Sequence, residues 1–202
     1  MSAESLRKTY KYRLHPTPAQ VRAMETVLWR CRELYNAGLE ERREAWRKCQ
    51  VSVTEAMQSA QLPGTKEVRP EFAEVNAQVL QDGLKRLDRA FQAFFCRVKA
   101  GEKAGYPRFQ GWDRYNSFTY KQVGEYGGAR LDNGFLVLSK IGRIAVRWSR
   151  PLEGTPKTVT ISHEADGWYV CFSCADVPNT AASWHWTGNR HRPGHRGVRY
   201  PV

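Results

Sequence analysis

The stretch KTYKYRLHPTPAQ, residues 8–20, combines a strand pattern with the start of a helix. In residues 8–14, basic side chains alternate with aromatic or apolar ones, which is typical of a half-buried strand. A strand of this length does not fold alone, so we expect it to join a sheet formed by later residues. The alternation places Lys11 and Arg13 on one face, and Tyr10, Tyr12 and Leu14 on the other.

The residues that follow predict a helical unit at 16–100. Thr17 with Gln20 forms a capping-box pattern around Pro18, and apolar residues at helical spacing extend this helix to about residue 48. Ser52 with Glu55 predicts a second helix to about residue 61, after which LPGTKEVRP breaks the chain. Apolar spacing then predicts a long amphipathic helix over 71–99.

From Gly101 the sequence changes from helical to strand patterns. A basic, turn-rich connector over 101–114 leads to five short predicted strands within 115–177, with hairpin turns at Asp132-Asn133-Gly134 and Ala165-Asp166-Gly167. We expect an α+β fold in which a small antiparallel β-barrel or sandwich includes the first strand, residues 1–15. The helices at 16–100 would then be an insertion, and 178–202 a disordered tail.

The charge, the hydropathy and the cysteine count limit the classes of function that are possible. The 202 residues carry a net charge of +12, with a pI of about 9.7, which favours a polyanionic partner such as nucleic acid. The sequence has no apolar run long enough to span a membrane and no signal-peptide core, so we expect a cytoplasmic protein without a membrane partner. Five cysteines, an odd number, predict reduced thiols.

We find no pattern for catalysis, cofactor binding or metal binding. The CFSC motif places Cys171 and Cys174 on opposite faces of a predicted strand, which favours packing over a zinc or redox site. His191 and His195 lack partner cysteines, and a phosphate-binding glycine loop is missing. We therefore expect no catalytic residue, no cofactor and no metal in this chain.

The connector and the strand after it carry the strongest positive signal. In GEKAGYPRFQGWDRYNSFTYK, basic side chains are interleaved with aromatic ones, so that cations can contact phosphates while rings stack on bases. The alternative for the aromatic residues is a hydrophobic plug between domains. The candidate residues here are Lys103, Tyr106, Arg108, Phe109 and Lys121.

In order and spacing, several segments resemble the N-terminal half of TnpB-type proteins, the RNA-guided DNA endonucleases of insertion sequences. These segments, within residues 7–177, are YRLHPTPAQ, LWRCRELYNAGLEERREAW, VLQDGLKRLDRAFQAFF, GYPRFQ, SFTYKQ and GWYVCFSC. The resemblance implies a wedge-type, OB-like barrel that grips guide RNA and the target-adjacent duplex. It also implies that the inserted helices are a recognition lobe, the first part of which is described as a helix-turn-helix domain.

The resemblance further implies roles for individual residues. Gln81 and Thr119 match positions that read the target-adjacent motif, and a glutamine amide can make bidentate contacts to adenine. Basic side chains would hold the backbone of guide RNA or heteroduplex; they are Lys11, Arg13, Arg97, Lys99, Lys103 and Arg108.

The sequence departs from the family after the barrel. The Gly-Ile-Asp motif, the further Glu and Asp and the four-cysteine zinc element of the family's nuclease domain are missing, although those carboxylates bind the Mg²⁺ ions that activate water. We therefore expect a chain truncated before the nuclease domain that binds without cutting, and a frameshift as one origin of the tail at 178–202. The alternatives are a stand-alone DNA- or RNA-binding accessory protein and an enzyme whose nuclease half is encoded separately.

Overall fold

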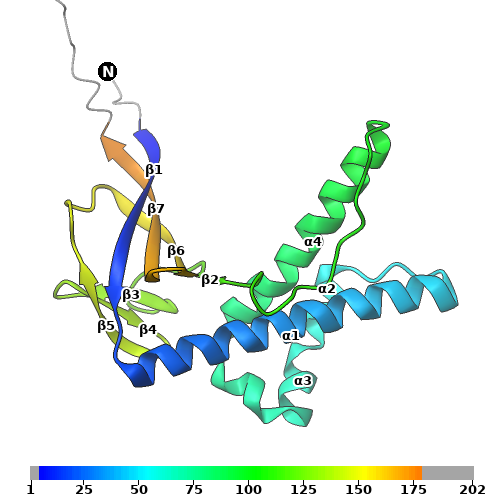
Figure 1. The fold of residues 1–202 in the computed structure, drawn as a ribbon, viewed down its shortest axis with the longest axis horizontal. Helices are drawn as coiled ribbons and strands as arrows, with labels where there is room; N and C mark the ends of the chain where they lie inside the picture. Colours follow the sequence, from blue (N-terminus) through cyan, green and yellow to red (C-terminus); the bar gives the residue numbers. More distant parts are fainter. Residues whose placement is uncertain (1–4, 179–202) are drawn as a thin grey trace, which may run out of the picture.

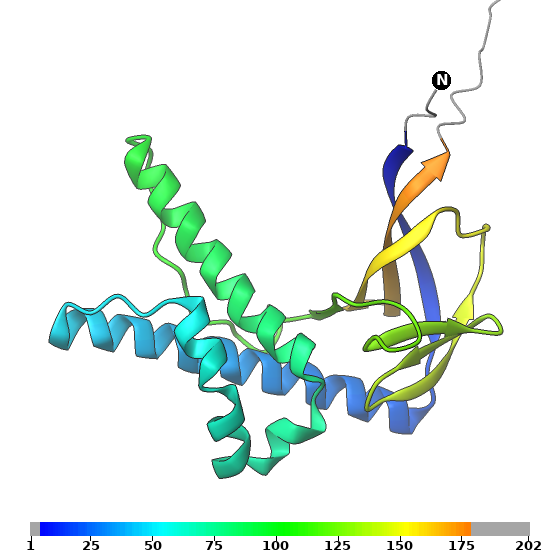
Figure 2. The same cartoon turned by 180° about the vertical axis from the view of Figure 1, so that it is seen from behind.

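The computed structural model describes residues 5–178 and shows two lobes side by side, a curled sheet and a group of helices (Figure 1). Helix α1 starts below the sheet and runs into the helical lobe, so it links the two (Figures 1 and 2). The elements in chain order are β1 (Ser5–His15), α1 (Pro18–Cys49), α2 (Glu55–Ala60), α3 (Leu62–Val68), the 3-10 helix η1 (Pro70–Glu74), α4 (Ala77–Lys99), β2 (Ser117–Tyr120), β3 (Ala129–Asp132), β4 (Phe135–Leu138), β5 (Gly142–Arg147), β6 (Thr155–Glu164) and β7 (Gly167–Pro178).

Strand β1 lies in the middle of the sheet. The seven strands are ordered β2-β6-β7-β1-β5-β4-β3, and β1 pairs antiparallel with β7 on one side and with β5 on the other. The prediction that the first strand joins the later ones is therefore confirmed. The predicted faces are also confirmed, because Tyr10, Tyr12 and Leu14 are buried whereas Lys11 is exposed and Arg13 half-buried.

The sheet curls into an antiparallel half-barrel. Its outer strands, β2 and β3, are connected by residues 121–128, which add an isolated bridge between Val123 and Ala129. Mixed helix and sheet composition is confirmed, and the antiparallel arrangement holds for all six strand pairs. The order of hydrogen-bonded strands begins at β2 and ends at β3, so the described strands do not form a closed barrel.

Both predicted hairpin turns are confirmed. Asp132 pairs with Phe135 across a two-residue loop, where Asn133 has a φ of 46° and Gly134 a φ of 79°, the positive values that this turn needs. Glu164 pairs with Gly167 in the second hairpin. Strand β3 was not predicted, since ARLD is only four residues long and follows a glycine-rich loop, and five predicted strands after the helices become six.

Helix α1 begins as its sequence predicts. The Thr17 hydroxyl accepts a hydrogen bond from the Gln20 amide, and the Gln20 side chain accepts one from the Thr17 amide at 2.9 Å. Pro18 fits because the first turn of a helix leaves its amides unpaired. The helix ends at Cys49, where Gln50 adopts a left-handed conformation with a φ of 55°.

The later helices differ from the predictions in three places. The N-cap of α2 is Thr54 and not Ser52, because the Thr54 hydroxyl accepts from the Met57 amide at 3.3 Å. The segment from Leu62 to Val68, predicted to break the chain, forms α3 with its proline in the first turn, where no donor is lost. The helix predicted over 71–99 is divided into η1 and α4, because Asn76 caps a new helix.

The core of the helical lobe lies between α1 and α4, with α2 packed beside them. Here Gln58 of α2 is buried and donates to the Gly38 carbonyl of α1 at 2.9 Å. A Cβ atom at Gly38 would lie 3.1 Å from the Gln58 amide nitrogen, so the close approach of α2 favours a glycine there. Buried Arg42 completes this contact by donating to Gln58 at 2.9 Å and to Asp88 at 3.1 Å.

Within residues 5–178, each helix is too short or too polar to cross a membrane. The five cysteines are free thiols, as predicted, and Cys174 is buried whereas Cys171 is half-buried on the other face of β7. The tail predicted to be disordered lies outside the described residues, apart from Pro178, the last residue of β7.

Candidate nucleic-acid interface

One face of α4 carries a row of exposed polar and basic side chains. Gln81, Lys85 and Arg89 are spaced by four residues, so they follow one side of the helix at intervals of about 6 Å; Arg97 lies about 12 Å further along and is turned about 80° around the axis from Arg89. The opposite face packs into the core through Leu80, Leu84, Leu87 and Phe91, among others. We call these four exposed residues the α4 stripe.

The three cations of the α4 stripe are not neutralised within the protein. Among residues 5–178, no carboxylate lies within ion-pair distance of Lys85, Arg89 or Arg97. Gln81 and Arg97 were predicted from the sequence, whereas Lys85 and Arg89 were missed. The spacing of four from Gln81 could have identified them, because both then fall on the same exposed face.

Next to the stripe, a buried carboxylate joins the helical lobe to the sheet. The side chain of Asp82 is only 4% exposed and lies between Arg86, at 3.0 Å, and Lys121, at 3.1 Å. Arg86 also donates to the Ser117 carbonyl at 2.7 Å and to the Thr119 hydroxyl at 3.1 Å. Two cations face one carboxylate here, so the cluster keeps an excess of positive charge.

This cluster determines where Thr119 and Lys121 lie. The Thr119 hydroxyl is 3.0 Å from the Thr160 hydroxyl on β6 and accepts from Arg86, so its orientation is set from two sides. Lys121 is paired with Asp82, which directly follows Gln81 in α4. The structure therefore brings Gln81, Thr119 and Lys121, three of the predicted residues, to the junction of α4 and β2.

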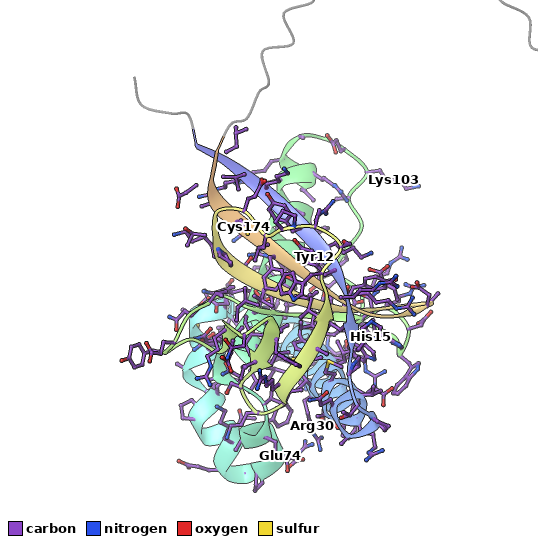
Figure 3. All side chains as sticks on the ribbon, turned by 90° about the vertical axis from the view of Figure 1, so that its left-hand side faces the viewer. Tyr12, His15, Arg30, Glu74, Lys103 and Cys174 are labelled. Atoms are coloured by element: carbon purple, nitrogen blue, oxygen red, sulfur yellow. The ribbon has the colours of Figure 1, made fainter. Side chains whose placement is uncertain are left out.

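A second group of predicted residues lies at the far end of α4 and along the connector. Arg97, Lys99, Lys103 and Arg108 are all exposed, and Figure 3 shows Lys103 on the loop that follows α4. Gln81 and Arg97 are 16 residues apart on one helix, which corresponds to about 24 Å. One base pair cannot contact both ends, so the two groups would meet different parts of a long ligand.

The aromatic residues of the connector divide between packing and exposure. Tyr106 makes edge contacts to Phe91 and Phe94, with ring centroids 5.5 Å and 5.4 Å apart, although 44% of its surface stays exposed. Phe109 is equally exposed and lies under the Arg43 guanidinium. Asn36 of α1 fixes the connector near both rings, because its side chain accepts from the Gln110 amide and donates to the Gln110 carbonyl.

The predicted cations of β1 have partners in the sheet. Lys11 donates to Glu164 at 2.7 Å and lies 4.4 Å from the ring centre of Tyr169. The hydrogen bond to Glu164 raises the pKa of Lys11 above its ordinary value. Arg13 contacts the Asp166 carboxylate at 3.8 Å and its carbonyl. Both residues lie apart from the α4 stripe, and a phosphate would compete with these carboxylates for them.

No cluster of three His, Cys, Asp or Glu residues suited to a metal ion occurs in the part of the chain that the structure describes. Burial raises the pKa of the Cys31 thiol to about 12, so this cysteine stays protonated and does not act as a nucleophile. What the geometry offers chemically is recognition by charge, hydrogen bonds and stacking.

Residues 1–50 match the family HTH_OrfB_IS605, described as a helix-turn-helix domain. The described part of this range forms one strand and one helix, β1 and α1. The chain is 32% identical over 182 residues to a protein of Streptomyces pristinaespiralis named for RNA-guided DNA endonuclease activity, covering 86% of this chain and 43% of that protein. It is 28% identical to InsQ of Escherichia coli K12, named for the same activity, covering 81% of this chain and 39% of InsQ.

The fold is similar to that in a cryo-EM structure of a Cas12f1–sgRNA–target DNA complex. The TM-score is 0.50 at 17% identity, and the match covers 86% of this chain and 49% of the other. The chain thus spans less than half the length of each of these three proteins. Sequence and fold together confirm the resemblance to TnpB-type proteins.

Proposed function

We propose that this chain, a TnpB-type protein by sequence and by fold, binds guide RNA and the DNA duplex beside the target. The names of its relatives and the RNA and DNA in the Cas12f1 complex support this assignment. The curled sheet would be a wedge-type, OB-like domain that holds RNA, and the helices would be the recognition lobe. The site of action would be the cytoplasm.

The observation that carries the proposal is the unneutralised charge of the α4 stripe. Three cations with no carboxylate partner in residues 5–178 lie along the exposed side of α4, beside the positive Asp82 cluster. A phosphate backbone releases bound counterions when it pairs with such cations, which supplies most of the affinity and makes it depend on salt. Because the cations are spread over about 18 Å along the helix, they fit an extended strand better than a single anion.

Base reading would fall to Gln81. Gln81 is exposed at the N-terminal end of the α4 stripe, and Arg86 of the same helix orders the Thr119 hydroxyl. The amide presents a donor and an acceptor together, the pattern that pairs with the adenine edge in a major groove. The surrounding cations would position the duplex, and Gln81 would distinguish its sequence.

The proposal concerns binding, and it assigns no catalytic group to residues 5–178. DNA hydrolysis of the kind named for the relatives requires carboxylates that hold Mg²⁺. Such groups, and a structural zinc element, would come from outside residues 5–178, in the same protein or in a separately encoded half. The second reading, a stand-alone accessory protein that binds DNA or RNA, predicts binding with no preference for a guide RNA.

Gln81→Ala tests the proposal, with Gln92→Ala as its matched control on the same helix. Affinity is measured for a set of duplexes of about 20 base pairs that differ at single positions, in the presence of a structured RNA. We expect Gln81→Ala to relax preference at one position, at a cost of about 1–3 kcal/mol for the preferred base, while Gln92→Ala changes nothing. Equal loss on all sequences would contradict the assignment.

A further inference from the structure

A cavity of about 420 Å³ lies where α1, the end of the connector and the β6–β7 hairpin meet. This volume is within the range of sites for small ligands, about 300–1,000 Å³. Each of the three elements contributes polar or aromatic side chains to it. The residues that matter here are Glu25, Trp29 and Arg32 of α1, Trp112 and Asp113 of the connector, and Glu164 of the hairpin.

Trp112 is the most unusual residue of this cavity. Its indole is 79% exposed, so it contributes little to the core, although tryptophan normally buries a large area. The Arg32 guanidinium lies 5.4 Å from the ring centre and holds the indole from one side. Trp29 also lines the cavity, is 42% exposed, and lies 4.0 Å from the Arg30 guanidinium. The cavity therefore offers two indoles, each ordered by an arginine.

The charges around the cavity select what can enter. Glu25 and Asp113 have no ion-pair partner within residues 5–178, whereas Glu164 is paired with Lys11. Free carboxylates repel a phosphate but accept hydrogen bonds from the exocyclic amino group of a base. Arg32, also without a carboxylate partner in the described chain, can attract the phosphate that follows the base.

We propose that this cavity binds a single unpaired nucleobase, stacked on Trp112 and recognised through its amino group by Asp113 and Glu25. The inference rests on the proposed function, because it assumes that nucleic acid reaches the protein. Stacking on an aromatic side chain tolerates any base, whereas the carboxylates favour adenine, cytosine or guanine over uracil. The site would thus recognise a bulged or flipped-out base beside the helices that hold the backbone.

The test uses the full chain and two RNA hairpins that differ at one bulged position, which carries adenine in one and no base in the other. Affinities are compared for the wild type, for Trp112→Ala and for the control Trp46→Ala, an exposed tryptophan at the other end of α1. We expect the wild type and Trp46→Ala to bind the adenine hairpin about tenfold more tightly, and Trp112→Ala to lose most of this difference. Trp112→Ala should fold normally because the ring is exposed.

The outcomes separate the two proposals. Binding of both hairpins with the same affinity by the wild type, or an unchanged preference in Trp112→Ala, would overturn the base site and leave the proposed function standing. Failure to bind either hairpin would overturn both. The same hairpins made of DNA show whether the site takes its base from RNA or from DNA. A gain in affinity from the bulged adenine in either nucleic acid supports the site. With uracil in place of adenine at the bulge we expect weaker binding. Asp113→Asn should reduce the difference in affinity between the adenine and the uracil hairpin.

Discussion

Helix α4 and strand β1 both present several cations, but the two sets differ in whether carboxylates lie close to them. Lys85, Arg89 and Arg97 on α4 have no carboxylate within ion-pair distance among the described residues. On β1, Lys11 and Arg13 contact Glu164 and Asp166 of the β6–β7 hairpin. Sequence alone counts these five cations equally. The difference teaches that availability to a phosphate depends on which carboxylates the fold brings near.

The largest effect is expected at Asp82, the buried carboxylate that joins α4 to the sheet. Asp82→Asn leaves Arg86 and Lys121 without an anion in a nearly buried position, and we expect a loss of about 2 kcal/mol in the free energy of unfolding. Urea unfolding followed by circular dichroism measures it. Glu44→Gln is the matched control, because Glu44 also lies between two cations but its side chain is 36% exposed, against 4% for Asp82.

Glu44→Gln should change the stability little, since exposed ion pairs are screened by water. If both variants lost the same stability, burial would not be the factor that distinguishes these carboxylates. If only Asp82→Asn unfolded more easily, the result would show that the buried Asp82 carboxylate stabilises the position of α4 against the sheet. The cations of β1 have no such buried partner among the described residues.

The second effect compares the cations directly. The double variant Lys85→Ala, Arg89→Ala should reduce the dependence of affinity on salt by about two in slope, and should weaken duplex binding at least tenfold at low salt. The double variant Lys11→Ala, Arg13→Ala removes the same charge from β1, but its cations already have carboxylate partners. We expect a slope change of less than about one for it. Equal slopes would contradict the distinction between the two surfaces.

The smallest effect concerns the acid that holds Arg13. The Tyr169 hydroxyl donates to Asp166 at 2.6 Å and is the main reason that the pKa of Asp166 lies below 3.8. A lowered pKa means that ionised Asp166 contributes stability above pH 3.8, and that the contribution is lost as the pH falls through the lower folded value. Arg13 therefore faces an ionised carboxylate at neutral pH.

Tyr169→Phe should raise the pKa of Asp166 towards its ordinary value, because it removes this donor. A carboxyl NMR titration measures the shift. Tyr10→Phe serves as the control, since the Tyr10 hydroxyl donates to Glu153 instead. An unchanged pKa in Tyr169→Phe would show that another group, rather than this hydroxyl, keeps the carboxylate ionised.

Local patterns in the sequence predicted the elements that depend on neighbouring residues. The capping box of Thr17 and Gln20, the alternation of β1 and the Asn133-Gly134 turn all involve residues within a few positions of each other, and all were confirmed. Errors arose where two local signals competed. Thr54 rather than Ser52 caps α2, because either hydroxyl could start a helix and the structure selects the one that reaches a free amide.

The candidate site was predicted only in part. Resemblance to a family indicated Gln81 and Thr119, and the interleaved basic and aromatic residues after α4 indicated Lys121; the structure brings all three to the junction between α4 and β2. Lys85 and Arg89 were not predicted, because charged residues are usual on the solvated face of an amphipathic helix and only the fold shows that these two have no carboxylate partner among residues 5–178. The nucleic-acid contacts of the eleven candidate residues stay predictions, and the variants above test those of Lys11, Arg13 and Gln81.

The sequence by itself determined the strand and helix patterns, the charge of +12 and the order of segments that identifies the family resemblance. Tertiary structure decided which cations are neutralised and which residues meet, as when Asp82 of α4 lies between Arg86 and Lys121, or when Trp29 and Trp112 line one cavity. The physical reason is the range over which the two kinds of interaction act. Backbone hydrogen bonds, caps and side-chain alternation act over a few residues, whereas ion pairs and cavities depend on distances in space between segments far apart in the chain.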